Sequence, residues 1–224
     1  MMAHEEPAMR VLITGASGAL GHAVVRRFAE YGWRVASLGT SADRDDGRFV
    51  AGDLAEEHNA KQVVDDAAAW LGGIDAFVHL AGAFRWIEVG SSTLADWRAL
   101  FDANVATAVA TTNAVRPHLL ARASMVFVGA RSAEPAGAGF GPYAAAKSGV
   151  ARLAEALSRE LAPRIRVNVV LPAIIDTPQN RADMPDVDPS LWTSPDAVAD
   201  AIVFLATPAS RAVNGALLPV GNPA

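Results

Sequence analysis

The chain of 224 residues contains no cysteine, which excludes disulfide bonds and thiolate metal sites. No apolar run approaches the roughly 20 residues that a membrane-spanning helix needs, so we expect no membrane partner. Basic residues form no cluster: 19 Lys and Arg stand against 24 Asp and Glu, giving a net charge of −5. A nucleic acid is therefore not an expected partner. The missing cysteines suit a reducing compartment, and we expect a cytoplasmic protein.

The sequence is rich in alanine and valine, and its apolar fraction is 51%. Short runs of Val and Ile alternate with longer stretches in which apolar residues are three and four positions apart. Strands that are apolar on both faces are typical of a parallel sheet covered by helices on each side. We therefore predict a single-domain α/β Rossmann fold, a doubly wound parallel sheet of about seven strands with helices on both faces. The expected strands are 10–14, 34–38, 48–50, 76–80, 124–128, 166–171 and 216–220, and the expected helices are 19–31, 60–71, 94–120, 143–161 and 195–206.

The ends and one internal stretch depart from this alternation. Residues 1–8 are polar and lack the pattern of a signal peptide, so we expect a flexible N-terminal tail. Residues 9–224 contain no linker or repeat and are predicted to form one domain. The stretch 176–195 is rich in Pro and Asp and too irregular for core structure. We expect it to be a substrate loop near the carboxyl ends of the strands.

The first expected strand runs directly into a glycine-rich turn and then a helix. Glycines at three-residue spacing permit a tight turn, close approach of the backbone to a pyrophosphate, and close packing of helix on strand. The free N–H groups at the start of the helix favour an anion. The turn predicts a dinucleotide site, with an ordinary strand–helix turn as the alternative. The residues assigned to cofactor binding here are Gly15, Ser17, Gly18, Ala19, Leu20 and Gly21.

The second strand ends in Gly39, Thr40 and Ser41, without the carboxylate that holds the adenine ribose in many NAD sites. Together with Arg44, the two hydroxyl residues are suited to a 2′-phosphate. This favours NADPH as cofactor and leaves NADH open; the alternative is a solvated turn. After the third strand, Asp53 can bind the adenine amino group or cap the next segment. Asp53 and its neighbour Leu54 are assigned to the cofactor site.

Tyr143 and Lys147 are four residues apart and therefore lie on one face of a helix. A phenol titrates near 10 in water, which is too high for ready proton exchange at neutral pH. We expect the nearby ammonium to lower the pKa of the phenol and also to hydrogen-bond the nicotinamide ribose. Both residues are assigned to catalysis and to cofactor binding.

These motifs, in this order, resemble the short-chain dehydrogenase/reductase family over nearly the whole chain. The resemblance implies that Asn104 holds a water in a proton relay; a buried helix residue satisfied by backbone is the alternative. It also implies that Thr177 contacts the nicotinamide carboxamide. The other residues that the resemblance assigns to the cofactor site are Ala81, Gly82, Pro172 and Ile175.

Two positions depart from the family pattern. Ala19 stands where the family turn has a glycine, and Ala130 stands where the family has its catalytic serine. Ser132 is the nearest replacement, although a residue two positions further along points differently. Segments 33–37, 129–133, 171–185 and 192–193 are similar to the quinonoid dihydropteridine reductase branch, which also lacks the serine. Gly39, Asn104 and residues 213–216 differ from that branch.

The sequence thus indicates an NAD(P)H-dependent oxidoreductase in which Tyr143 donates a proton, assisted by Lys147 and Asn104. The expected substrate is a small molecule, either a quinonoid or dihydropterin-like ring or a carbonyl compound. One alternative is a carbonyl reductase or alcohol dehydrogenase that uses Ser132. Another is a dinucleotide-binding sensor without catalytic activity, which is suggested by Ala130 in place of the catalytic serine.

Several further residues have two interpretations. Five aromatic or flexible side chains can line a pocket for a flat substrate or fill the core. His79, after the fourth strand, is expected to pack rather than transfer protons. The carboxylates of 176–188 have no paired His, so no metal site is expected. The family resemblance implies that helices 94–120 and 143–161 pack against their counterparts in a second subunit, and because both are Ala-rich and permit close approach, we expect a homodimer or homotetramer. The five pocket candidates are Phe84, Trp86, Phe140, Met184 and Trp192.

Overall fold

The computed structural model describes residues 8–40 and 46–221, so Ser41, Arg44 and nearly all of the expected N-terminal tail lie outside the described residues. Seven parallel strands form one sheet in the order β3-β2-β1-β4-β5-β6-β7. This confirms the predicted doubly wound fold. The strands are β1 (Arg10–Thr14), β2 (Arg34–Gly39), β3 (Arg48–Val50), β4 (Ile74–His79), β5 (Leu119–Val128), β6 (Arg166–Pro172) and β7 (Leu217–Val220).

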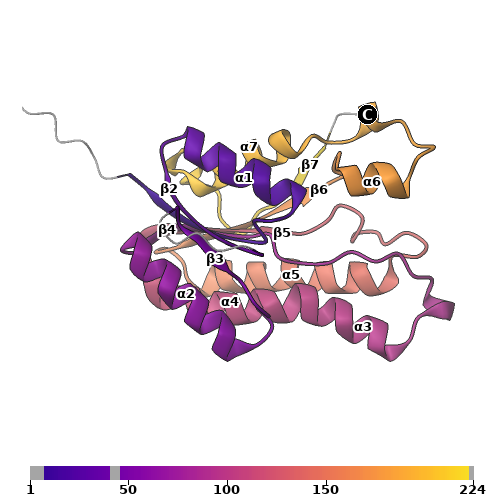
Figure 1. Ribbon diagram of the computed structural model, residues 1–224, viewed down its shortest axis with the longest axis horizontal. Helices are drawn as coiled ribbons and strands as arrows, with labels where there is room; N and C mark the ends of the chain where they lie inside the picture. The colour runs from indigo at the N-terminus through magenta and orange to yellow at the C-terminus, as the bar shows by residue number, and fades with distance from the viewer. Residues whose placement is uncertain (1–7, 41–45, 222–224) are drawn as a thin grey trace, which may run out of the picture.

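Helices cover both faces of the sheet (Figure 1). One face carries α1 (Ala19–Glu30) and α7 (Pro195–Ala206); the other carries α2 (Glu57–Leu71), α4 (Thr107–Val115) and α5 (Gly141–Glu160). Two further helices, α3 (Leu94–Phe101) and α6 (Pro178–Asp183), extend past the sheet at one end (Figure 1). Within the described ranges, none of the helices has the length and apolar character of a membrane span.

The alternation of side chains along each strand divides the interior into two apolar cores. Leu12 and Phe77 are fully buried in the core under α2, α4 and α5. Their neighbours Val11, Ile13 and Val78 are fully buried in the core under α1 and α7. Successive strand residues point to opposite faces, so a strand buried on both sides must be apolar at every position. This is why the strands appear in the sequence as continuous Val- and Ile-rich runs.

The predicted helix 94–120 is confirmed as a continuous helical run that ends at His118, but its winding is not regular throughout. After α3 the chain passes through a π-helical segment, Asp102–Ala106, then α4, and ends in a 3₁₀ turn, Arg116–His118. Pro117 lies in that turn and has no N–H to donate, so the α-helix does not continue past it. Leu119 instead pairs with Ile74 as the beginning of β5, five residues earlier than predicted.

The stretch 176–195 is more ordered than its composition predicts. It contains α6 and a 3₁₀ turn, Pro189–Leu191. Its end is built into the interior: Trp192 and Thr193 are 5% and 1% exposed, and Thr193 bridges to Ile175. Trp192 is therefore core filler, which was one of its two interpretations. Met184 ends α6 as its C-terminal flanking residue.

The strands end together at one edge of the sheet. Thr14 pairs with His79 at the ends of β1 and β4, and Val128 pairs with Val170 near the ends of β5 and β6. The chain proceeds outward from β1 to β3 and then returns to β4 on the other side of β1. Ligands of doubly wound sheets bind at the carboxyl edge beside such a reversal. The fold therefore predicts a site beside the ends of β1 and β4.

We predict that Arg166→Met lowers the free energy of unfolding by about 2 kcal/mol, because it deprives partly buried carbonyl groups of their donor. Arg166 begins β6, and its guanidinium donates to the carbonyls of Leu205, in the last turn of α7, and of Thr207 and Ser210 after it. Urea unfolding measures the change. Arg164→Met is the matched control, since Arg164 is exposed and its side chain has no partner among the described residues. Equal effects of the two substitutions would contradict this role.

Candidate active site

The glycine turn after β1 holds two backbone segments in close contact. Gly15 has a φ of +69°, and a Cβ there would lie 2.7 Å from the Ala81 nitrogen. A Cβ on Gly21 would collide with the Gly15 carbonyl oxygen, so α1 packs directly on the turn. Thr14 Oγ1 accepts hydrogen bonds from the N–H groups of Leu80 and Ala81, both at 3.2 Å. The turns after β1 and β4 are thus joined.

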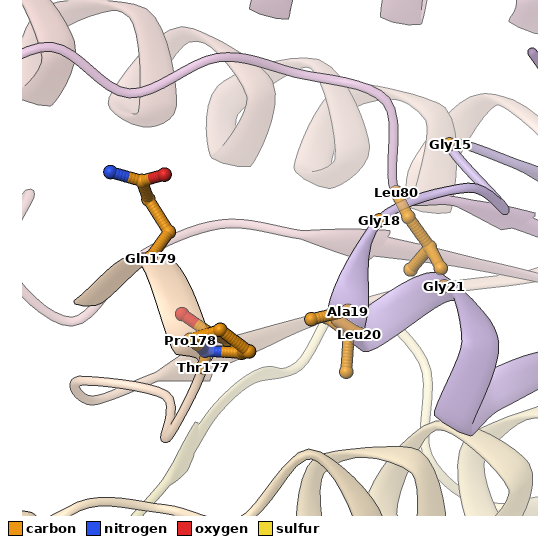
Figure 2. Close-up of a pocket in the computed structure, with 9 residues that line it drawn as sticks. All are labelled: Gly15, Gly18, Ala19, Leu20, Gly21, Leu80, Thr177, Pro178 and Gln179. Carbon is orange, nitrogen blue, oxygen red and sulfur yellow. The ribbon is translucent and has the colours of Figure 1, made fainter. Parts of the chain in front are cut away.

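A cavity of about 480 Å³ opens in front of this turn (Figure 2). A Cβ on Gly18 would have no neighbour closer than 3.6 Å, so the backbone there is open. α1 has no side-chain cap and no acidic residue in its first turn, and its amino end is therefore free to bind an anion. These features fit the pyrophosphate of a dinucleotide. The lining residues are Gly15, Gly18, Ala19, Leu20, Gly21, Leu80, Thr177, Pro178 and Gln179.

The opposite wall of the cavity comes from the start of α6. Thr177, predicted from the family pattern, lines the cavity and also caps α6 by accepting from the Asn180 N–H at 3.1 Å. Pro178 and Gln179 were not predicted, because the stretch was treated as loop. An expected helix cap at Thr177, followed by Pro at the first helical position, is the signal that could have identified them.

The end of β2 is built around the Ser17 hydroxyl. Ser17 Oγ accepts from the Thr40 N–H at 2.7 Å and lies 3.1 Å from Thr40 Oγ1. A Cβ on Gly39 would collide with Ser17 Oγ, so this position accommodates no carboxylate side chain without rearrangement. The structure brings Ser17, Gly39 and Thr40 together as predicted.

Asp53 acts here as a cap. Its Oδ1 accepts from the Ala55 N–H at 2.9 Å, and its carbonyl accepts from the Asn59 amide at 2.9 Å. This is the capping interpretation of Asp53. Leu54 is 5% exposed and belongs to the core under α2. The contact of either residue with adenine stays a prediction.

His79 is a buried packing residue at the end of β4. Its Nδ1 lies 3.0 Å from Thr14 Oγ1 and 3.2 Å from Thr111 Oγ1, and its ring packs against Phe77 and Phe127. Burial and, to a smaller extent, the Lys147 charge lower the pKa of His79 to about 3. A neutral imidazole of this kind fixes the strand ends and exchanges no proton near neutral pH.

Asn104 and Lys147 face a common space above Gly82. Asn104 lies in the π-helical segment, and its Nδ2 donates to the carbonyls of Ala83 and Leu100, both at 2.9 Å. Its Oδ1 is buried and has no hydrogen-bond partner among the described residues. A Cβ on Gly82 would lie 2.5 Å from that oxygen and 3.2 Å from Lys147 Nζ. Glycine thus leaves the space between amide and ammonium open, as a bridging water requires.

The structure corrects the predicted acidity of Tyr143. Its ring makes an edge contact with Phe84, with centroids 4.9 Å apart, and Phe140 lies 6.4 Å away. Burial raises the pKa of Tyr143 to about 12, whereas the sequence predicted a lowered value. Lys147 Nζ is on the expected side, 5.9 Å from the ring centroid, but it donates to the Val128 carbonyl at 3.1 Å. At that distance, removal of the phenol from water raises its pKa by more than the Lys147 ammonium lowers it.

Burial also lowers the pKa of Lys147 to about 8. Lys147 is therefore predominantly an ammonium at neutral pH and becomes neutral only in mildly alkaline solution. Tyr143 keeps its proton over the same range. Both members of the pair are therefore protonated near pH 7, which is the state that a proton donor requires.

The end of β5 carries no hydroxyl at the position of the family serine. Ala130 is 7% exposed, and the N–H groups of Gly129 and Arg131 donate to β6 at Val170 and Pro172. Ser132 follows in a turn that is closed by the Ala133 N–H on the Ala130 carbonyl. The structure records no hydrogen bond between Ser132 and Tyr143 in the described chain, and the role of Ser132 stays a prediction.

The remaining predicted cofactor residues lie at the end of β6. Pro172 is buried, and its carbonyl accepts from the Arg131 N–H at 3.0 Å. Ile175 packs on the core under α7, and its carbonyl accepts from the Asn180 amide at 2.8 Å. Across residues 8–40 and 46–221, no group of three His, Asp or Glu residues is arranged to hold a metal ion.

We predict that Lys147→Met removes a pH dependence of stability. The pKa of Lys147 is about 8 in the folded protein and about 10.4 in an unfolded chain. Between these values the unfolded chain binds more protons, so wild-type stability rises with pH, by up to about 3 kcal/mol relative to the variant. Urea unfolding across this interval measures it. Lys61→Met, at an exposed position, is the control; identical pH curves for wild type and Lys147→Met would contradict the prediction.

Comparison with known proteins agrees with this geometry. A family model described as short chain dehydrogenase matches residues 9–188. A 1,2-dihydroxy-1,2-dihydronaphthalene dehydrogenase from a Ralstonia species is 31% identical over 176 residues, covering 72% of this chain and 68% of the relative. The 3-oxoacyl-acyl-carrier-protein reductase FabG of Vibrio cholerae is 27% identical over 231 residues, covering 94% and 95%.

Among solved structures, a blue fluorescent protein from a metagenomic library, in complex with NADPH, has 30% identity and a TM-score of 0.86. The match covers 95% of this chain and 96% of that protein. The family model spans well over half of the chain, and the glycine turn, Asn104, Tyr143 and Lys147 occupy one edge of the sheet. The chain therefore belongs to the short-chain dehydrogenase family of NAD(P)-dependent oxidoreductases.

Proposed function

We propose that the protein is an NADPH-preferring reductase of a small, conjugated substrate, a quinonoid or dihydropterin-like ring, with Tyr143 as proton donor. The observation that carries this proposal is the surrounding of Tyr143. Its ring stands against Phe84 and near Phe140, whereas Ala130 supplies no second hydroxyl. A carbonyl oxygen that becomes an oxyanion benefits from two donors, whereas a conjugated ring spreads the developing charge. The relative that acts on a dihydroxydihydronaphthalene is itself a dehydrogenase of a ring compound.

The residues of the chain have separate tasks in this reaction. A bound nicotinamide dinucleotide supplies the hydride. The open amino end of α1 binds the pyrophosphate, and Gly15 and Gly21 allow the turn to approach it. The protonated Tyr143 phenol then gives its proton to the substrate. A pKa of about 12 keeps Tyr143 protonated near pH 7, which is the form that donates in the direction of reduction.

Lys147 and Asn104 restore the proton. Lys147 is held by the Val128 carbonyl, and the unpartnered oxygen of Asn104 faces the same space above Gly82. A water in this space can accept from Lys147 and donate to Asn104 Oδ1, so Asn104 holds the water beside the ammonium that supplies the proton. As the phenol loses its proton, the ammonium stabilises the resulting charge more strongly than it affects the neutral ring.

NADPH preference is supported by the end of β2. Ser17 Oγ takes the place that a side chain at Gly39 would need, so no carboxylate opposes a 2′-phosphate there. Beside it Ser17 and Thr40 are exposed; the Thr40 hydroxyl donates to Ser17 Oγ, which leaves the Ser17 hydroxyl proton for a phosphate oxygen. The related structure with NADPH bound agrees with this preference.

A carbonyl reductase that uses Ser132 is the second candidate. It is favoured by the similarity to a 3-oxoacyl-acyl-carrier-protein reductase, which acts on a ketone. In this case the Ser132 hydroxyl would be the second donor beside Tyr143, since Ala130 has no hydroxyl to donate.

We also propose that the protein is cytoplasmic and self-associates through α3, α4 and α5 as a dimer or tetramer. Phe101 and Val109 are 52% and 37% exposed on this part of the surface. The alanines of α4 are buried in the core of the chain, whereas Ala145 and Ala156 of α5 are exposed and permit close approach of a second helix.

Tyr143→Phe is expected to lower kcat/KM by about 10²-fold or more, since it removes the general acid. NADPH reduction of a quinonoid dihydropterin and of a carbonyl panel measures this loss. The affinity for NADPH, from fluorescence titration alongside NADH, should change little because the ring remains. Full activity of the variant would remove Tyr143 from the mechanism.

Ser132→Ala separates the two candidate functions. A ring reductase keeps its rate within about twofold, whereas a carbonyl reductase that depends on this donor loses about 10²-fold or more. Ala130→Ser is the companion variant, because it places a hydroxyl at the family position. If Ser132→Ala abolishes activity and Ala130→Ser raises carbonyl turnover, the ring-reductase proposal is wrong.

A further inference from the structure

The segment that follows β4 contacts two residues of the proton-transfer site in succession. The Ala83 carbonyl accepts from the Asn104 amide at 2.9 Å. The next residue, Phe84, makes the edge contact with Tyr143, with ring centroids 4.9 Å apart. Phe84 and Trp86 are 50% and 54% exposed, so burial in the core does not by itself hold this segment in place.

The segment is held by Trp86, whose indole lies on the backbone of Gly139. A Cβ on Gly139 would collide with the indole, and Gly139 has a φ of +77°, so glycine is required there on two grounds. Trp86 Nε1 donates to the Ala138 carbonyl at 3.2 Å, and the Ile87 N–H donates to the Gly139 carbonyl at 2.8 Å. We call these contacts of Trp86 and Ile87 with residues 138–139 the Trp86 clamp.

The clamped residues lead directly into the first turn of α5, which carries Tyr143. Phe140 flanks the amino end of the helix, and its carbonyl accepts from the Ala144 N–H at 2.6 Å. A Cβ on Gly141 would lie 2.8 Å from Val89 Cγ2, so the segment after β4 touches the beginning of α5 at a second point. The backbone on which Tyr143 stands is therefore fixed from outside its own helix.

The segment after β4 is in turn anchored to α3. Arg85 pairs with Asp96 at 2.7 Å, at the surface. Trp97 Nε1 donates to Ser92 Oγ at 2.9 Å, and Ser92 Oγ donates to the Val89 carbonyl at 2.9 Å. The Trp86 clamp thus joins two helices: it connects a segment fastened to α3 with the start of α5.

We propose that Trp86 is a positioning residue for Tyr143, which it holds in place through Gly139 and the start of α5. The inference rests on the proposed function, in which Tyr143 gives a proton to the substrate. A proton donor must lie within hydrogen-bond reach of its acceptor, and a displacement of about 1 Å can cost about 10²-fold in rate. Trp86 is four residues from Gly90 and 57 from Tyr143 in the chain, so only the folded structure brings it to this task.

The position of Tyr143 can be measured without a substrate, because the chain has only two tyrosines. Ring ¹³C-labelled tyrosine gives separate signals for Tyr143 and for Tyr31, which is 63% exposed and serves as an internal reference. Tyr143→Phe assigns them. In the full chain with NADPH bound, Trp86→Ala should move the Tyr143 signal toward that of Tyr31, because the ring loses its fixed place against Phe84.

The second readout is steady-state kinetics with NADPH and whichever quinonoid dihydropterin or carbonyl compound wild type reduces fastest. Trp86→Ala should lower kcat about tenfold or more and change KM less than about twofold, because the donor is displaced while substrate binding is kept. Trp86→Phe keeps a ring over Gly139 and should retain most of the wild-type kcat. Rates are expressed per NADPH site, so that unfolded protein does not count.

Gly139→Ala disturbs the same contact from the other side, since its methyl group meets the indole. It should move the Tyr143 signal as Trp86→Ala does, and the two substitutions should not be additive, because they remove one contact. Trp70→Ala is the matched control: Trp70, on α2, also packs on a glycine of positive φ, Gly47. It should lower stability and leave both the Tyr143 signal and kcat at their wild-type values.

An unchanged Tyr143 signal in Trp86→Ala would overturn the proposal. A rise in KM at constant kcat would also overturn it, because Trp86 would then contact substrate rather than position Tyr143. The same holds if Trp70→Ala moves the Tyr143 signal as far as Trp86→Ala does. Full activity of Tyr143→Phe overturns the proposed function, whereas the Tyr143 signal tests the Trp86 clamp independently of turnover.

Discussion

The contact between the turns after β1 and β4 is the constraint on which the site depends. Gly15 and Ala81 approach so closely that no side chain fits between them, and Thr14 joins the two turns through its hydroxyl. The contact sets the height of α1 above the sheet and, through the loop that follows β4, the position of Gly82. The phosphate end and the proton-transfer end of the site are therefore parts of one backbone arrangement.

In this site, burial is the main cause of the shifted pKa values. The imidazole of His79, the ammonium of Lys147 and the phenol of Tyr143 are each shifted toward their neutral forms. Among these, His79 loses its charge entirely near neutral pH, whereas Lys147 keeps a charge that it can still give up. The low dielectric environment that disfavours the charges also strengthens their interaction with a reacting group. A site of this kind is most effective when substrate closes it from water.

Much of this could be predicted from the sequence, because the decisive features are local. Apolar periodicity predicted all seven strands, and three glycines predicted the turn. What could not be predicted depends on three-dimensional packing. The wide turn at Asp102–Ala106 lies inside an Ala-rich helical pattern that does not reveal it, and the acidity of Tyr143 depends on burial by residues such as Phe84, which is distant in sequence.

The π-helical segment has a consequence for chain length. In Asp102–Ala106 the N–H of Thr107 reaches back to the carbonyl of Asp102, so this turn holds one residue more than an α-helical turn. Loss of one residue there would restore regular α-helical winding while the helices on either side keep their faces, because the wide turn absorbs the extra residue within itself. Asn104 would then leave the space above Gly82. The extra residue of this turn therefore serves the position of Asn104 rather than the packing of the helices on either side.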